Sequence, residues 1–378
     1  MTESRLPINP IYEEIGIRPM IHAGGTNTDH GGSRMRPEVI EAMVQASQSY
    51  VPVAELSRKV GDFMAEITGA EAGMVTAGAG SGIVLSAAAC MTGLDRSKIL
   101  QLPDTHGVKD EIVIAKAHRG GYSHMYTFTG ASLIEVGDAQ AWSTDEIDAA
   151  INDNTAAVAF LLAPRISRRG PTLSETVEVA HARGVPVIVD AAAMLPPRSN
   201  LSRYIADGAD LVTYSGGKEI RGPQATGLLV GRKDLVDAAL ANHSPNHAIG
   251  RPHKVSREDM VGLWMALKLY VEHDEEAAIT GFRVALGPIA EAVEDIPGLE
   301  VSIRQDDFRF FLPNVVVKLT PEWGGPSGSV VRAALMEGDP RIGIRFDPDH
   351  NELEINAFNM QAGEPEIVAA RLREELLR

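Results

Sequence analysis

The segment TYSGGKEIRGPQATGLLVG, residues 213–231, places one lysine after two glycines and between two apolar stretches. Burial disfavours the charged form of lysine, so Lys218 is either exposed in its turn or used in chemistry. Two other features could share that chemistry. Asp190 ends the apolar run VPVIVD, and TAGAGSGIVLSAA (residues 76–88) is a glycine-rich junction between a strand and a helix.

Taken alone, each feature has an ordinary structural explanation. Lys218 could be a turn lysine, Asp190 a helix cap or salt-bridge partner, and the glycine run a tight turn. The glycine run is not a dinucleotide fingerprint, because Ile83 occupies the place of the third glycine. It is not a Walker A loop either, because no GK[ST] sequence ends it.

Taken together, the three features match the needs of pyridoxal 5'-phosphate. Its aldehyde needs a lysine amine, its pyridinium nitrogen needs a buried carboxylate, and its phosphate needs a helix N-terminus. The pattern predicts that Lys218 forms a Schiff base with the cofactor and that Asp190 holds the ring nitrogen. The phosphate is then expected at the start of the helix, on Gly78, Ala79, Gly80 and Ser81.

Seven apolar segments are expected to form the strands that position these residues: 73–76, 111–115, 132–137, 156–163, 185–190, 210–215 and 226–231. Helical segments separate several of them, and two of these helices open with capping boxes, Ser143 with Glu146 and Thr172 with Glu175. Apolar strands alternating with helices indicate an α/β fold with a mainly parallel sheet covered on both faces. Ligand groups gather at the carboxyl ends of such strands, where Asp190 lies.

After Gly231 the pattern changes to a long helical region, which includes SREDMVGLWMALKLYVEH. Four strand segments follow (LEVSIRQ, NVVVKL, RIGIRF and ELEINAF), mixed with helices near 327–337 and 364–377. This predicts a smaller α+β domain. We expect an N-terminal segment of residues 1–50, a large domain of 51–255, and a linking helix with the small C-terminal domain over 256–378. The linking helix could bring the N-terminal segment to the small domain.

Composition excludes several classes of partner. The 378 residues are 44% hydrophobic and 23% charged, as in a globular protein with a sizeable core. Fifty-one acidic against 35 basic residues give a net charge of −16, which argues against nucleic acid and anionic membranes. Cys90 is the single cysteine, and the sequence has neither a signal peptide nor a membrane span. A cytoplasmic protein is expected.

The chain resembles fold-type-I pyridoxal-phosphate enzymes, and among them the group related to bacterial selenocysteine synthase (seryl-tRNA selenium transferase). The resemblance covers nearly the whole chain, through GGTNTDHGGSRM, LSRKVGDFMAEITGAEAGMVTAGAGSGI, VPVIVDAAAMLPP, ADLVTYSGGKEIRGPQATGLLVG and GEPEIVAARLREEL. It implies that Ser215 contacts the cofactor phosphate and that His118 stacks on the pyridine ring, with Tyr122 and His124 as alternatives. Gln224 is a further candidate for cofactor contact.

The acidic balance suits tRNA poorly, so the nearest analogy is the small-molecule branch, such as D-glucosaminate-6-phosphate ammonia-lyase. This implies a lyase for a small amino acid or amino sugar acid, with Lys218 removing the α-proton before a group leaves Cβ, and a homodimer or larger assembly. Carbon–carbon cleavage, racemisation and group transfer at Cβ are alternative reactions. A cofactor-binding regulatory protein without catalysis is an alternative of another class.

Arginines are candidates for holding an acidic substrate, because a guanidinium fork matches a carboxylate or phosphate. Arg165 directly follows the strand segment 156–163, and Arg251 and Arg341 are further candidates. A surface salt bridge is the alternative explanation for each of them.

No metal site is expected. DPDHNELE (347–354) resembles a calcium loop, but Glu352 occupies the place of the required glycine, so a hairpin turn is predicted. His22, His30, His118 and His124 lack the spacing of zinc ligands.

Overall fold

The computed structural model describes residues 9–378, which fall into two compact units. The larger unit is Met35–His273, and the smaller joins the residues up to Arg34 with Asp274–Arg378. These limits differ from the expected boundaries at residues 50 and 255. The reason is that α2 (Pro37–Ser47) packs against α11 (Arg257–Glu272), where a Cβ on Gly262 would lie 2.8 Å from Met43 Cγ. Both helices therefore belong to the larger unit.

The larger unit is built on a seven-stranded sheet with the strand order β2-β8-β7-β6-β5-β3-β4. Only β8 runs antiparallel to its neighbours, because the turn of residues 216–226 that joins it to β7 contains no crossover helix. The prediction of a mainly parallel sheet from these seven segments is confirmed. The strands are β2 (Ala72–Thr76), β3 (Glu111–Ala115), β4 (Ser132–Val136), β5 (Thr155–Leu161), β6 (Val187–Asp190), β7 (Leu211–Ser215) and β8 (Gly227–Gly231).

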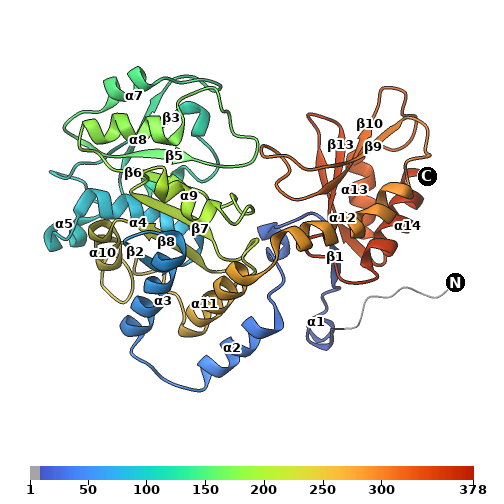
Figure 1. Cartoon of the computed structure of the whole chain (residues 1–378), viewed down its shortest axis with the longest axis horizontal. Helices are drawn as coiled ribbons and strands as arrows, with labels where there is room; N and C mark the ends of the chain where they lie inside the picture. The colour runs from blue at the N-terminus through green and yellow to red at the C-terminus, as the bar shows by residue number, and fades with distance from the viewer. Residues whose placement is uncertain (1–8) are drawn as a thin grey trace. The chain divides into compact units, whose positions relative to one another are not determined.

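Helices cover both faces of this sheet (Figure 1). One face packs against α11 and against α3 (Val53–Thr68), α7 (Thr144–Ala150), α8 (Leu173–Ala182) and α9 (Asn200–Ala206). The other face packs against α4 (Gly78–Thr92), α6 (His124–Thr127) and α10 (Lys233–Asn242). The short helix α5 (Arg96–Gln101) follows α4. The two predicted capping boxes are present at the starts of α7 and α8.

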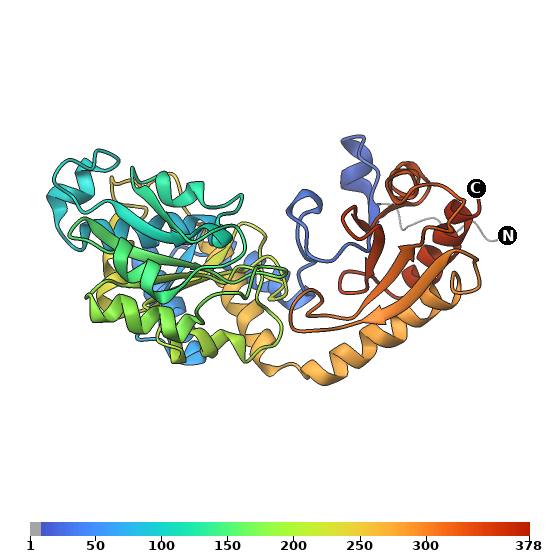
Figure 2. The same cartoon turned by 90° about the horizontal axis from the view of Figure 1, so that it is seen from above.

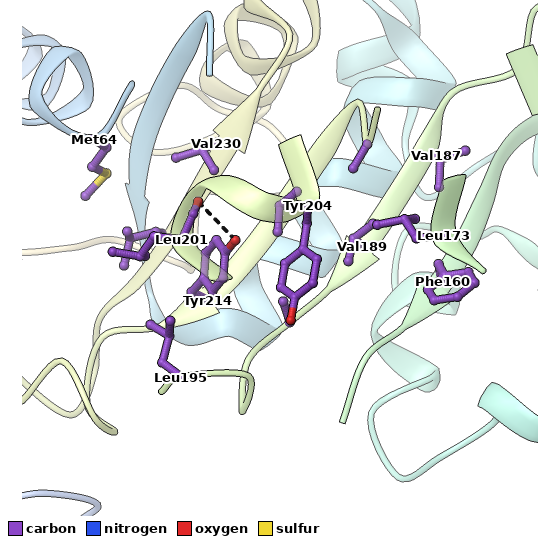
Figure 3. Close-up of a cluster of buried hydrophobic side chains, with 14 of the residues drawn as sticks. Met64, Phe160, Leu173, Val187, Val189, Leu195, Leu201, Tyr204, Tyr214 and Val230 are labelled. Carbon is purple, nitrogen blue, oxygen red and sulfur yellow. Dashed lines mark hydrogen bonds between the residues drawn. The ribbon is translucent and has the colours of Figure 1, made fainter. Parts of the chain in front are cut away.

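Tyr214 fixes which way β7 presents its side chains. Its ring is fully buried, and its hydroxyl donates to the carbonyls of Asn200 at 2.8 Å and Leu201 at 3.3 Å. Figure 3 shows the bond to Leu201. Because side chains alternate along a strand, Thr213 and Ser215 point to the opposite face, which is the α4 face. The strand therefore turns hydroxyl groups toward the helix that follows β2.

The smaller unit contains an antiparallel sheet with the order β12-β13-β10-β9 and a parallel pair of strands, β1 and β11. The predicted strand RIGIRF is divided between the two sheets, because β11 pairs with β1 while β12 pairs with β13. The segment 347–354 forms the predicted hairpin turn into β13. The strands are β1 (Met20–His22), β9 (Leu299–Arg304), β10 (Asn314–Leu319), β11 (Arg341–Gly343), β12 (Arg345–Asp347) and β13 (Glu352–Asn356).

The helices α12 (Glu275–Glu291), α13 (Gly328–Glu337) and α14 (Glu364–Leu376) pack against this four-stranded sheet. Figure 2 shows α12, in orange, running beside the orange and red strands. Leu286, Val317, Leu353 and Leu372 lie in the buried core between helices and sheet. The N-terminal part of this unit adds α1 (Pro10–Glu14) and the short 3-10 helix η1 (Thr28–His30). The predicted smaller α+β domain is therefore present.

The close approach of α4 to β7 gives a test of the packing. A Cβ on Gly82 would lie 2.1 Å from Thr213 Oγ1, and that hydroxyl is already bound to the carbonyl of Leu228 at 3.0 Å. Gly82→Ala should therefore lower the free energy of unfolding by about 1–3 kcal/mol. Urea denaturation followed by circular dichroism would measure this loss.

The matched control is Gly281→Ala in α12, where no atom lies within 4 Å of the added Cβ. That substitution should stabilise the protein by up to about 1 kcal/mol, because alanine is the better helix former. Equal effects at the two glycines would contradict the packing described here.

Candidate functional site

One edge of the larger sheet gathers the three features found in the sequence. The strands β2, β6 and β7 run in the same direction, so their carboxyl ends meet at this edge. Asp190 at the end of β6 lies beside Thr213 of β7 in the strand register. The helix α4 starts just after β2, and Lys218 lies three residues after the end of β7.

Asp190 is a carboxylate held in the protein interior. It is 6% exposed, and its Oδ1 accepts a hydrogen bond from the Ala192 amide at 3.0 Å. Burial raises the pKa of Asp190 above its ordinary value, while the Ala192 amide and the positive charge of Lys218 act in the opposite direction. A buried carboxylate of this kind is stabilised by a cation beside it. Lys218 is near enough to Asp190 for its charge to be felt there.

Lys218 lies in a turn that folds back on itself. The Gly216 amide donates to the Thr226 carbonyl at 2.8 Å, and the Gly222 amide donates to the Gly216 carbonyl at 2.8 Å. A Cβ on Gly217 would lie 2.5 Å from the Cα of Gln224, so this position needs glycine. Residues 222–226 thus pack against residues 216–217, which brings Gln224 against the lysine turn. Lys218 is left half-buried.

The start of α4 offers unpaired hydrogen-bond donors. No side chain caps this helix, so its first-turn amides have no partner from the helix itself. The Ser81 hydroxyl, in the same turn, is buried and has no hydrogen-bond partner in the part of the chain that the structure describes. Unpaired amides and the positive end of the helix dipole favour an anion at this point.

These residues fit pyridoxal 5'-phosphate. The α4 start suits its phosphate, the buried carboxylate of Asp190 suits a protonated pyridine nitrogen, and the Lys218 amine suits its aldehyde. Ser215 ends β7 beside them and is half-buried. The prediction that these residues share one site agrees with this geometry, and their individual contacts to the cofactor stay predictions.

His118 is enclosed by aromatic side chains near the end of β5, where Leu161 is paired with Asp190. It ends the short 3-10 helix η2 (Lys116–His118), is 2% exposed, and packs edge-on against Trp142 at 4.4 Å and Phe160 at 4.6 Å between ring centroids. Its Nδ1 accepts the Leu161 amide at 3.3 Å, which leaves Nε2 as the protonated nitrogen. A side chain that stacks on a cofactor ring needs one open face, and this packing leaves almost none.

The predicted alternatives to His118 are more open. Tyr122 and His124 are both exposed, and they lie just before α6 and at its first residue. In the same segment, Met125 lies near the α4 start, since a Cβ on Gly80 would be 3.6 Å from the Met125 sulfur. Stacking from residues 119–125 therefore fits the structure better than stacking from His118.

The three candidate arginines belong to different elements, and one of them to the other unit. Arg165 is exposed and follows β5 in a turn where its φ of 67° is left-handed, a conformation that a non-glycine residue rarely adopts. The backbone at the end of β5 joins that of β6, because the Leu162 amide donates to the Asp190 carbonyl at 2.8 Å. Arg251 is exposed in the loop after α10, and Arg341 belongs to the smaller unit.

Two residues of the site were not found from the sequence. The Thr213 hydroxyl lies 3.4 Å from the Ala79 carbonyl at the α4 start, and alternation along β7 could have indicated it, because Thr213 and Ser215 share a face. Tyr126 of α6 is buried, and burial together with the charge of Asp190 raises the pKa of its phenol. No sequence pattern indicates that contact.

Within residues 9–378, no helix is long and apolar enough to cross a membrane. No group of three or more His, Cys, Asp or Glu side chains in that range is arranged to hold a metal ion.

Comparison with known proteins places these features in context. The family model of L-seryl-tRNA selenium transferase matches residues 25–288. D-glucosaminate-6-phosphate ammonia lyase of Salmonella typhimurium is 32% identical over 96% of this chain and 97% of its own length. The 5'-C-glycyluridine monooxygenase-decarboxylase of a Streptomyces species is also 32% identical, over 97% of this chain and 92% of its own.

Structural comparison agrees with these matches. A solved structure of D-glucosaminate-6-phosphate ammonia-lyase superposes with a TM-score of 0.86 at 30% identity, covering 98% of this chain and 99% of its own. The predicted fold type I is confirmed.

The burial of His118 has a consequence for stability. Burial lowers the pKa of His118 from its ordinary 6.5 to about 4. Between these values the unfolded chain binds more protons than the native protein, so the free energy of unfolding should fall as the pH falls from about 6.5 to about 4. The contribution of His118 is on the order of 3 kcal/mol.

His118→Asn, which keeps an acceptor for the Leu161 amide, should reduce this pH dependence and leave the part that comes from His22, whose pKa burial also lowers to about 4. Urea denaturation across the pH range measures the slope. The control is His106→Asn at an exposed histidine, which should keep the wild-type slope. An unchanged slope in His118→Asn would show that His118 is not the buried neutral group described here.

Proposed function

This chain belongs to the L-seryl-tRNA selenium transferase family of enzymes, and we propose that it is a pyridoxal-phosphate-dependent lyase for a small amino acid or amino sugar acid. The reaction removes the α-proton, expels a substituent from Cβ, and gives a 2-oxo acid and ammonia. The observation that carries this proposal is the meeting of buried Asp190, Lys218 and the uncapped α4 start at one sheet edge. The similarity to D-glucosaminate-6-phosphate ammonia lyase over nearly the whole chain supports it.

When bound, pyridoxal phosphate supplies an electron sink for the negative charge that develops at the substrate's Cα. The residues of the chain have three tasks around it. The first-turn amides of α4 bind the phosphate, and the carboxylate of Asp190 keeps the pyridine nitrogen protonated. The Lys218 amine would accept the α-proton, and the effect of its charge on Asp190 supports this role.

The remaining predicted contacts belong to this proposal. Ser215 and Gln224 contact the cofactor, since both flank the lysine turn. Arg165 binds the acidic end of the substrate, because it follows β5 at the edge where Asp190 lies. Arg251 and Arg341 are proposed as further substrate contacts on their sequence pattern alone. His118 is proposed as a neutral group that supports the end of β5 through its bond to Leu161.

A second reaction class has one specific observation in its favour. The 5'-C-glycyluridine monooxygenase-decarboxylase is as similar in sequence as the ammonia lyase. A decarboxylation that consumes oxygen would release carbon dioxide and would not form ammonia. Analysis of the products therefore distinguishes this reaction from that of an ammonia lyase.

We also propose that the enzyme is a homodimer. The segment from α2 to the start of α3 exposes several apolar side chains, of which Tyr50 is 93% exposed: Ile40, Val44, Tyr50, Val51 and Val53. Exposed apolar side chains gathered in one segment are typical of interaction sites, and a second copy of the chain would bury them.

A cytoplasmic location is proposed on the single cysteine and acidic composition, and cell fractionation would test it.

The reaction is tested by product analysis with amino acids and amino sugar acids that carry a hydroxyl or phosphate leaving group at Cβ. We expect a 2-oxo acid and ammonia in equal amounts, with the cofactor recovered as pyridoxal phosphate after turnover. Asp190→Ala and Lys218→Ala should each lower turnover by about 100-fold or more. Lys233→Ala, at an exposed lysine paired with Asp237, is the control and should keep activity.

Other products would replace the proposal. Stoichiometric pyridoxamine phosphate would identify an aminotransferase, an aldehyde product a carbon–carbon lyase, and oxygen uptake with carbon dioxide release the second candidate. Normal turnover in Asp190→Ala would mean that another residue holds the ring nitrogen.

The dimer is tested by placing charge on the exposed apolar surface. Val44→Lys combined with Tyr50→Lys should convert the dimer to a monomer in sedimentation velocity, because burying two ammonium groups opposes association. Val284→Lys, at an apolar residue of α12 that is 72% exposed, is the control and should leave the dimer intact. A monomeric wild-type protein would overturn the proposal.

A further inference from the structure

A group of nitrogen-bearing side chains lies on one face of the two-stranded sheet in the smaller unit. In the parallel register His22 is paired with Gly343, and Met20 with Arg341. Paired residues of neighbouring strands point to the same face, so His22 and Arg341 share one. The alternate residues Ile21 and Ile342 point to the other face, into the core of the unit.

His30 completes this group from the glycine-rich loop. Its ring meets the His22 ring edge-on, with 4.9 Å between centroids and 88° between planes. It also lies over Gly343, where a Cβ would be 3.1 Å from His30 Cε1 and 2.3 Å from Met20 Cε. Glycine at position 343 therefore leaves the space in which two side chains from separate segments converge.

The nitrogen atoms of this group lack partners. Within residues 9–378, both ring nitrogens of His22, Nδ1 of His30 and Nε of Arg341 are buried without a hydrogen bond. Buried polar atoms in native proteins are nearly always hydrogen-bonded, and those that are not call for an explanation. These four atoms lie on three neighbouring side chains. A neutral histidine donates from one ring nitrogen, so the group offers one unpaired donor from each side chain and indicates a missing acceptor.

The charges around His22 also favour an anion at this place. Burial, then His30, then Arg345 lower the pKa of His22 to about 4, and no carboxylate is among the causes. The Arg345 guanidinium is occupied by main-chain oxygens, donating to the Gly24 carbonyl at 2.7 Å and the Thr26 carbonyl at 3.5 Å. The neighbours that shift the pKa of His22 are therefore positive ones, in a chain of net charge −16.

We propose that His22, His30 and Arg341 form a binding site for a small oxyanion, a phosphate or carboxylate group, in the smaller unit. The oxygens of the anion accept one hydrogen bond from each of these three side chains. All three side chains belong to the smaller unit, whereas the start of α4 belongs to the larger unit.

Calorimetric titration of the cofactor-loaded enzyme tests the site, because the phosphate site at α4 is then filled. Inorganic phosphate and acetate serve as separate probes, and saturable binding of one per chain is expected. Tighter binding of phosphate assigns the site to a phosphate group, and tighter binding of acetate to a carboxylate. His22→Phe and Arg341→Met should each weaken that binding at least tenfold, while Arg332→Met, at an exposed arginine of α13, should not change it.

Two results would overturn the proposed oxyanion site. Absence of saturable binding of both probes to the wild-type enzyme overturns it, as does unchanged binding in His22→Phe and Arg341→Met. Thermal unfolding gives a second readout, because the bound oxyanion should raise the melting temperature of the wild type and of Arg332→Met but of neither site variant. His30→Gln replaces His22→Phe if that variant does not fold.

Discussion

The buried carboxylate of Asp190 is the group around which the larger unit is arranged. A carboxylate that is 6% exposed loses most of its hydration, and the Ala192 amide replaces only a part of it. The raised pKa of Asp190 reflects the part of this desolvation cost that is not offset. A positive charge beside it lowers that cost, and Lys218 or a protonated pyridine nitrogen supplies such a charge. A parallel sheet, whose strands end together, brings the lysine turn and the helix start to this carboxylate.

The position of the site depends on contacts that allow no added atoms. Gly82 lets α4 approach β7 until Thr213 touches the first turn of the helix, and Gly217 lets the lysine turn cross the chain at Gln224. On the other face, Tyr214 anchors β7 through its hydroxyl. The strand is thereby fixed from both sides, and the orientation of Ser215 and Lys218 follows from it. Small residues in this region hold functional groups in place and have no chemistry of their own.

The two units carry different kinds of unpaired polar group. In the larger unit they are the amides and the Ser81 hydroxyl at the start of α4, which a cofactor phosphate would satisfy. In the smaller unit they are nitrogens of two histidines and an arginine, which an oxyanion would satisfy. Both sets donate hydrogen bonds, and both belong to a protein whose net charge is strongly negative. Local donors therefore oppose the overall charge wherever an acidic ligand is to be held.

The sequence by itself determined the strands of the large sheet, the two capping boxes and the grouping of Lys218, Asp190 and residues 78–81. These depend on local patterns: apolar runs, capping residues, and the rule that parallel strands end at one edge. The tertiary structure alone decided the direction of β8, the unit limits near residues 34 and 273, and the burial of His118 against Trp142 and Phe160. It alone also brought His22 and His30 together with Arg341, more than 300 positions later in the chain. Contacts between distant segments depend on how whole elements pack, and a local pattern of residue types does not predict them.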